Sequence, residues 1–273
     1  MGLGTVGSQR TRFGVLTGVL VCLAIAAAGC GGSSETPEII YVSPPPATLA
    51  PGATPTPSPP PPGIGSAVIS TTAPDGRWTV TFKKPVISGV IPSAATNINN
   101  AITARVNSYI SAFTSKGLPA IAGDAGPSTL DGDFTIALDT RSVISLRFSI
   151  LTYVSGAASS VGQAGSINLN ASTGATINLA DLFSDSATAL SIISSKTKAA
   201  LSSHLGNELT WPSGTLALSY FDKAWVFTPA GLEFAWSQEA IATHAAGMPS
   251  AVVSWADLKP AIKAGGPAGE FVR

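Results

Sequence analysis

The segment Val143-Ile-Ser-Leu-Arg-Phe-Ser-Ile-Leu-Thr-Tyr153 gives a clear indication of the fold class of this chain. Apolar residues such as Leu146 and Phe148 alternate in it with polar Arg147 and Ser149. A period of two residues predicts a β-strand that buries one face and leaves the other more polar. The rest of the folded region is therefore expected to build a sheet around this strand.

Further alternating runs, bounded by turn residues, predict additional strands on both sides of this one. They cover residues 67–72, 78–82, 86–91, 134–138, 166–170, 225–228, 232–236 and 252–254. Apolar residues at helical spacing predict two main helices, one from Ile98 to Phe113 and one from Ala187 to His204. Because strands and helices come in runs rather than in strict alternation, we expect an α+β fold with mixed or antiparallel sheets.

The N-terminal segment has the pattern of an export signal. Arg10 and Arg12 precede an apolar run over residues 13–28, which ends in Ala27-Ala28-Gly29-Cys30. A basic start, an apolar centre and small residues before a cleavage point are typical of a signal peptide. A cysteine directly after the small residues favours lipidation of Cys30, so residues 1–29 are predicted to be removed. A plain cleaved signal and an uncleaved anchor helix remain alternatives, although the run is short of the ~20 residues of a membrane span.

Residues 30–65 have a different composition, rich in proline, glycine, serine, threonine and alanine. Such a segment buries too little apolar surface to fold and favours an extended tether. Folded sequence is expected from Ser66 onward, as an N-terminal α+β module over 66–150 and a C-terminal α+β module over 151–273. The two modules are predicted to pack as one globular unit.

Charge and cysteine content exclude several kinds of protein. The chain has 15 basic and 15 acidic residues, and removal of Arg10 and Arg12 with the leader leaves 13 basic against 15 acidic. A near-neutral domain without basic runs lacks the electrostatic footprint of nucleic-acid binding. Cys22 and Cys30 are the only cysteines, so the folded part has no disulfide and no thiolate metal site.

Three segments carry a resemblance to a known family. They are the strand–turn segment Ile167–Phe183 with its Leu179-Ala180-Asp181-Leu182-Phe183 ending, the hairpin Phe227–Phe234, and the closing segment Val252–Leu258. In order and spacing they resemble the RsiV-type extracytoplasmic domain, which is found in a lysozyme-sensing anti-sigma factor, in a peptidoglycan deacetylase (PdaC) and in secreted mycobacterial immunogenic proteins. The low lysine content and the abundance of alanine, glycine and proline are compatible with an actinobacterial source.

The resemblance implies a ligand site but also departs from the family pattern. Relatives often carry Tyr-x-Gly-Gly-Ala-His, whereas this chain has Tyr153-Val154-Ser155-Gly156-Ala157-Ala158. Ala158 therefore stands where relatives place histidine, and His244 stands where they often have tyrosine. The resemblance implies ligand-binding roles for Tyr153, Ser155, Gly156, Asp181 and His244.

The residues offer little for catalysis or metal binding. No G-x-S-x-G motif of a serine esterase is present, and His204 and His244 are the only histidines. His244 is the better candidate for a general base, and His204 is expected to face solvent. Asp131 and Asp133 have a calcium-like spacing, but no full calcium loop follows. We expect no cofactor and no metal.

Five aromatic residues gather in the C-terminal third. They are Trp211, Tyr220, Trp225, Trp236 and Trp255. At least three of them are expected in the core, although aromatic residues also line glycan- or peptide-binding grooves.

The sequence as a whole favours a lipid-anchored protein on the outer face of a bacterial cell membrane. We expect its domain to bind an extracellular protein, such as a muramidase, or a cell-wall glycan without catalysis. A weak envelope esterase with His244 as base and a structural lipoprotein of envelope assembly are the alternatives.

Overall fold

The computed structural model describes residues 62–121, 123, 126–214 and 216–272. The predicted leader, Cys30 and nearly all of the predicted tether lie outside these residues. None of the helices in the described part of the chain has both the length and the apolar content that a membrane crossing requires.

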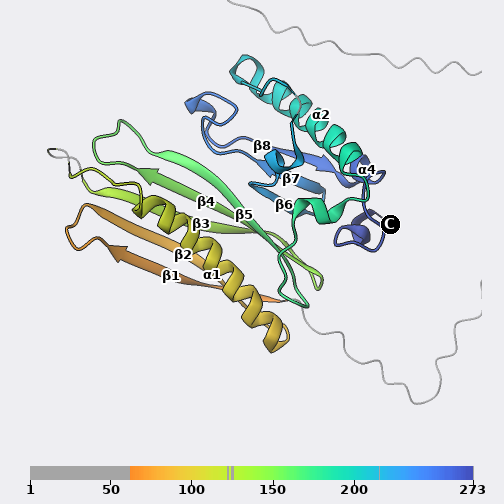
Figure 1. Ribbon diagram of the computed structural model, residues 1–273, viewed down its shortest axis with the longest axis horizontal. Coiled ribbons are helices and arrows are strands. Elements are labelled where there is room, and N and C mark those ends of the chain that lie inside the picture. Colours follow the sequence, from red (N-terminus) through yellow and green to blue (C-terminus); the bar gives the residue numbers. More distant parts are fainter. Residues whose placement is uncertain (1–61, 122, 124–125, 215, 273) are drawn as a thin grey trace, which may run out of the picture. The chain divides into compact units, whose positions relative to one another are not determined.

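The described residues form a mixed α+β fold with two sheets (Figure 1). The five-stranded sheet has the order β1-β2-β3-β4-β5, and the three-stranded sheet has the order β6-β7-β8. The strands are β1 (Gly63–Thr72), β2 (Trp78–Ser88), β3 (Ser128–Asp139), β4 (Val143–Tyr153), β5 (Val161–Asn170), β6 (Trp225–Thr228), β7 (Gly231–Ala235) and β8 (Ser250–Ser254). The α-helices are α1 (Pro92–Thr114), α2 (Ser186–Leu205), α3 (Leu218–Phe221) and α4 (Trp255–Leu258). The 3₁₀ turns are η1 (Leu179–Leu182), η2 (Gly206–Glu208), η3 (His244–Ala246) and η4 (Gly269–Val272).

Helix α1 connects the single parallel pair of the larger sheet. Strands β2 and β3 run parallel, while the other neighbouring pairs in this sheet are antiparallel. A parallel pair needs a long crossover, and α1 supplies it. Ile98, Ile102 and Val106 are fully buried, and Pro92 occupies a first-turn position that needs no N–H donor. The helical spacing in the sequence therefore predicted the buried face of α1 correctly.

The larger sheet separates two hydrophobic clusters. Leu146 and Phe148 of β4 belong to the cluster under α1. Val143, on the opposite face of β4, belongs to the cluster of the smaller sheet, α2 and α4. Asp185 caps the start of α2, because its side chain accepts hydrogen bonds from the backbone N–H groups of Ala187 and Thr188.

The boundaries differ in places from those expected. Residues 63–65, which were expected in the tether, pair with β2 through Gly63 opposite Ser88. Strands β4 and β5 both belong to the first sheet, so that sheet continues past residue 150. Strand β3 begins at Ser128 rather than near Phe134, because Ser128–Gly132 pairs in register with β2 although it lacks a clear apolar alternation.

Candidate functional site

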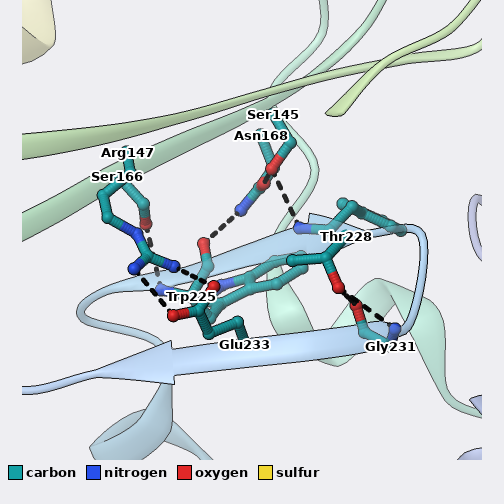
Figure 2. Close-up of polar contacts among 9 residues, drawn as sticks. Ser145, Arg147, Ser166, Asn168, Trp225, Thr228, Gly231 and Glu233 are labelled. Carbon is teal, nitrogen blue, oxygen red and sulfur yellow. Dashed lines mark hydrogen bonds and ion pairs between the residues drawn. The ribbon is translucent and has the colours of Figure 1, made fainter. Parts of the chain in front are cut away.

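A polar seam joins the smaller sheet to the larger one. We define the seam as Ser145, Arg147, Ser166, Asn168 and Glu233. Figure 2 shows side chains of β4 and β5 reaching the backbone of β6. The Ser145 hydroxyl accepts a hydrogen bond from Phe227 N–H at 2.9 Å.

Strand β5 supplies the other contacts of the seam to β6. The Asn168 amide donates to the Trp225 carbonyl at 2.9 Å, and the Ser166 hydroxyl accepts from Trp225 N–H at 3.1 Å. Ser145 and Asn168 are also bonded to each other at 2.5 Å. Buried backbone groups of β6 therefore find their partners in side chains rather than in a further strand.

Arg147 and Glu233 form a two-pronged ion pair within the seam (Figure 2). The two N–O distances are 2.7 Å and 2.5 Å. Burial alone raises the pKa of Glu233, but hydrogen bonds from Arg147 and Ser250 and the charge of Arg147 outweigh it, so the pKa is lowered. The pair links β7 to β4.

The end of β4 and the turn that follows it contain three of the predicted site residues. Tyr153 is half-buried, and its hydroxyl accepts from Gly156 N–H at 3.3 Å. Ser155 is 7% exposed, and its backbone N–H donates to the Ser128 hydroxyl at 2.9 Å. Tyr153 and Ser155 thus help to hold the turn.

His244 contacts the same turn through Ser159, a residue for which the sequence predicted no role. Its Nε2 lies 3.3 Å from the hydroxyl of Ser159, and its Nδ1 lies 3.0 Å from Oε1 of Glu239. Ser159, His244 and Glu239 therefore form a hydrogen-bonded chain in the order of a catalytic triad. The His244 and Glu239 side chains are 43% and 57% exposed, so this chain lies open to solvent.

Backbone strain marks Glu239. It is the one non-glycine residue with a positive φ, 64°, in the described part of the chain. Such a conformation costs of order 1–3 kcal/mol and persists only where neighbouring structure enforces it. Gln238 provides that enforcement, because its side chain accepts from Gly162 N–H at 2.8 Å and donates to the His244 carbonyl at 2.8 Å.

Asp181 lies apart from the other predicted site residues. Its carboxylate accepts hydrogen bonds from the backbone and side chain of Asn178, both at 3.0 Å, and caps the 3₁₀ turn η1. Asn178 follows the Asn170 end of β5, whereas His244 lies beside the Val161 end. A strand rises about 3.3 Å per residue, so the two ends are roughly 30 Å apart. The structure therefore joins His244 to the β4–β5 turn through Ser159 and leaves Asp181 elsewhere.

An aromatic cavity of about 250 Å³ adjoins the loop that carries Glu239. Tyr220, Phe221 and Trp236 are among its walls, and Lys223 and Ser237 add polar groups. Burial raises the pKa of Tyr220, and a hydrogen bond from the Trp236 indole opposes the rise. The cavity is hereafter called the aromatic cavity.

The aromatic residues divide between core and surface largely as expected from the sequence. Trp225, Trp236 and Trp255 are at most 8% exposed and belong to the core. Trp211 and Tyr220 are partly buried and pack against that core. Trp236 has a double role, since it is buried and also forms a wall of the aromatic cavity. The sequence indicated the aromatic cluster but not the cavity, because the cavity forms only where α3 packs against β7.

The two acidic residues with calcium-like spacing lie elsewhere, in a groove on the larger sheet. Asp131 and Asp133 line this groove with Lys83, and Lys83 lies 3.7 Å from Asp133. No three His, Cys, Asp or Glu side chains converge as a metal site within the residues that the structure describes. His204 is exposed near the end of α2, as expected.

Comparisons with known proteins found one family model that matches part of the chain. Residues 180–256 match the model of DUF3298, described as a protein of unknown function. No curated protein matches the chain. A DUF3298 family protein from Pseudomonas aeruginosa PAO1 is similar in structure, with 10% identity, a TM-score of 0.49, and coverage of 74% of this chain and 94% of that chain. A DUF3298 member from Bacteroides fragilis NCTC 9343 has 14% identity, a TM-score of 0.42, and coverage of 74% and 94%. The segment that matches the DUF3298 model, residues 180–256, includes both Asp181 and His244.

Proposed function

We propose that this protein is a lipid-anchored envelope protein that binds a cell-wall glycan without cleaving it. The aromatic cavity carries the proposal, because its walls and polar groups suit one sugar ring. Its volume of about 250 Å³ is somewhat smaller than a pocket for a drug-sized ligand. The resemblance to RsiV-type domains supports an extracytoplasmic ligand of this kind, and a muramidase-like protein is the competing ligand.

The chemistry of the cavity matches that of a sugar. Aromatic walls provide apolar area at low entropic cost, and a few polar groups fix the orientation. The Ser237 hydroxyl accepts from Ala164 N–H at 3.2 Å, so its proton remains to be donated to a ligand oxygen. Lys223 is exposed and adds an ammonium donor at the cavity.

Peptidoglycan is the natural probe for this proposal. Purified protein should sediment with insoluble peptidoglycan, and Tyr220→Ala and Lys223→Ala should each reduce the bound fraction. His244→Ala serves as the matched control, because His244 is exposed and does not line the aromatic cavity. Binding that is lost in His244→Ala but kept in Tyr220→Ala would move the site to the β4–β5 turn.

The anchoring part of the proposal rests on Cys30 and the apolar leader before it. Cys30→Ala should shift the protein from the membrane fraction to the soluble fraction. A variant that stays tightly bound to the membrane would favour an uncleaved anchor helix.

A hydrolase is the second candidate, favoured by the chain of Ser159, His244 and Glu239. A serine nucleophile needs a base within hydrogen-bond reach and a third group that orients the base, and both contacts are present. Two observations weigh against it. The side chains of His244 and Glu239 are solvent-exposed, whereas electrostatic catalysis works best in a water-excluded site. Ser159 also lies in a surface turn rather than in a strand-to-helix elbow.

Hydrolysis of short acyl esters separates the two candidates. The proposal predicts negligible turnover, and any trace should survive Ser159→Ala and His244→Ala. A positioned general base contributes ~10²–10⁴-fold to the rate. Robust turnover that falls by such a factor in both variants, with unchanged thermal unfolding, would establish the hydrolase instead.

A further inference from the structure

Within the residues that the structure describes, the larger sheet protects one of its edges and leaves the other open. At the β5 edge, Gln238 N–H donates to the Gly162 carbonyl and Ile177 N–H donates to the Asn168 carbonyl, at 2.9 Å and 2.8 Å. The Ser237 hydroxyl accepts from Ala164 N–H at the same edge. Strand β1 forms the opposite edge (Figure 1), and β2 is its one strand partner within the described residues.

The register of β1 shows which backbone groups face outward. Ala73 N–H donates to the Trp78 carbonyl at 2.9 Å, and the next pair is Thr72 with Thr79. Antiparallel pairs alternate between bonded and non-bonded positions. The N–H and C=O groups that point away from β2 therefore belong to Ile64, Ser66, Val68, Ser70 and Thr72.

Strand β1 also lacks the features by which proteins block an open edge. Natural edge strands are short, charged, interrupted by proline or twisted by a bulge. Gly63–Thr72 is a ten-residue strand with the sequence GIGSAVISTT, and its register with β2 runs without a shift. Val68 is 68% exposed, the highest value among the exposed large apolar side chains that the structure describes.

We propose that β1 is the interface of a two-fold homodimer, in which it pairs antiparallel with β1 of a second copy across an axis at Val68. A two-fold axis perpendicular to the sheet keeps the same face of both sheets on one side. It pairs the residues whose backbone N–H and C=O groups point away from β2 with the corresponding residues of the second copy. Val68 then meets its own copy, Ser66 meets Ser70, and Ile64 meets Thr72. Each such pair exchanges two backbone hydrogen bonds, and the exposed Val68 side chains become buried against each other.

A second copy fits this edge better than an unrelated chain does. It brings an identical open edge, so that one pairing protects both molecules. Assembly then stops at two copies, because the β5 edge is already capped. The strand carries no charge, so identical strands do not repel one another. The nearest lysine, Lys83, is three strand spacings or ~14 Å from its copy, beyond the Debye length of about 8 Å at physiological salt.

The proposed dimer would change one surface of the protein. The groove beside β1, about 490 Å³ in volume, is lined by Val68, Lys83, Asp133 and Leu151 among others. The two-fold axis places both grooves on the same face, opposite the two α1 helices, and they meet at the Val68 pair. This inference is independent of the glycan proposal, because it involves the β1 edge of the larger sheet, whereas the aromatic cavity adjoins the β5 edge.

Sedimentation of the purified full-length chain over a range of concentrations tests the proposal. The protein used for this experiment has the substitutions Cys22→Ser and Cys30→Ser, and it is kept in detergent. We expect a monomer–dimer equilibrium whose dissociation constant rises about tenfold or more in Val68→Lys, which sets two ammonium groups against each other. Val252→Lys is the matched control, because Val252 is 45% exposed on β8. At a concentration low enough that both variants are monomeric, circular dichroism should show equal thermal transitions for the two.

Crosslinking tests the position of the axis. In the same cysteine-free chain, Val68→Cys should crosslink to a dimer with a short bismaleimide, and Val161→Cys, at a site 41% exposed on β5, should not. A monomer at every concentration, a dimer indifferent to Val68→Lys, or equal crosslinking of the two variants would each overturn the proposal.

Discussion

At the scale of single residues, the polar seam depends on side chains of β4 and β5. They bond to backbone groups of β6 that would otherwise pair with a neighbouring strand. Ser145 is fully buried, and its hydroxyl donates to Oδ1 of Asn168 while accepting from Phe227 N–H. A hydroxyl with two partners in a buried site does more for stability than an exposed one, because its removal leaves those partners unpaired. The alternation in β4 predicted that Ser145 lies on the more polar face, but not that it would bond to a second sheet.

Ser145→Ala is expected to lower the free energy of unfolding by about 2–4 kcal/mol, since it leaves a buried N–H and a buried amide oxygen without this partner. Ser149→Ala is the control, because Ser149 lies on the same face of β4 and is exposed. Urea titration of both variants measures the difference. Equal stability of the two would show that water replaces the Ser145 hydroxyl at no cost.

The Arg147–Glu233 pair predicts a pH dependence. The pKa of Glu233 is lowered in the folded protein, so its contribution is present above its unfolded pKa of about 4.3. That contribution disappears as the pH falls through the folded pKa. Glu233→Gln should cost about 1–3 kcal/mol at neutral pH.

Thermal unfolding of the wild type and of Glu233→Gln across pH 7 to 3 measures this dependence. The difference between the two proteins should shrink below about pH 4. A difference that stays constant over the whole range would mean that the ion pair contributes no pH-dependent stability.

At the scale of elements, the sequence predicted what local periodicity determines. The buried faces of α1 and β4 and the β6–β7 hairpin follow from spacing and turn residues. The polar seam, the aromatic cavity and the contact of Ser159 with His244 join residues far apart in the chain. Periodicity carries no information on such contacts, so no local signal pointed to Ser159. The family resemblance implied ligand-binding roles for both Asp181 and His244. The ten-residue length of β5 separates the two residues in the structure.

Gly231, at the start of β7, shows how tightly the hairpin packs against β8. A Cβ at this position would lie 2.0 Å from the carbonyl oxygen of Val253, which is closer than any real contact. Gly231→Ala should therefore destabilise the protein by more than about 3 kcal/mol, because strand β8 has to move. Gly126→Ala is the control, since a Cβ there meets nothing within 4 Å. Equal melting temperatures of the two variants would contradict the pairing of Gly231 with Ser254 in the register of β7 and β8.

At the scale of the whole molecule, the described residues have two hydrophobic clusters that share strand β4. Val143 packs in one cluster and Ile144 in the other. A shared strand and a buried polar seam couple the clusters, so we expect one cooperative unfolding transition. Reducing agent should not change it, because Cys22 and Cys30 both precede the described residues. Calorimetry of the purified protein with and without dithiothreitol measures this, and two separate transitions would show that the clusters unfold independently.

The aromatic cavity is proposed to bind a glycan without cleaving it. Calorimetric titration of the purified protein with the β-1,4-linked trimer of N-acetylglucosamine measures this binding. We predict saturable binding at one site per chain, recovery of intact trimer, and a dissociation constant raised about tenfold in Tyr220→Ala, equivalent to about 1.4 kcal/mol. Tyr153→Ala, which changes the β4–β5 turn instead, should bind as the wild type does. No measurable binding, cleavage of the trimer, or loss of binding in Tyr153→Ala but not in Tyr220→Ala would contradict the claim.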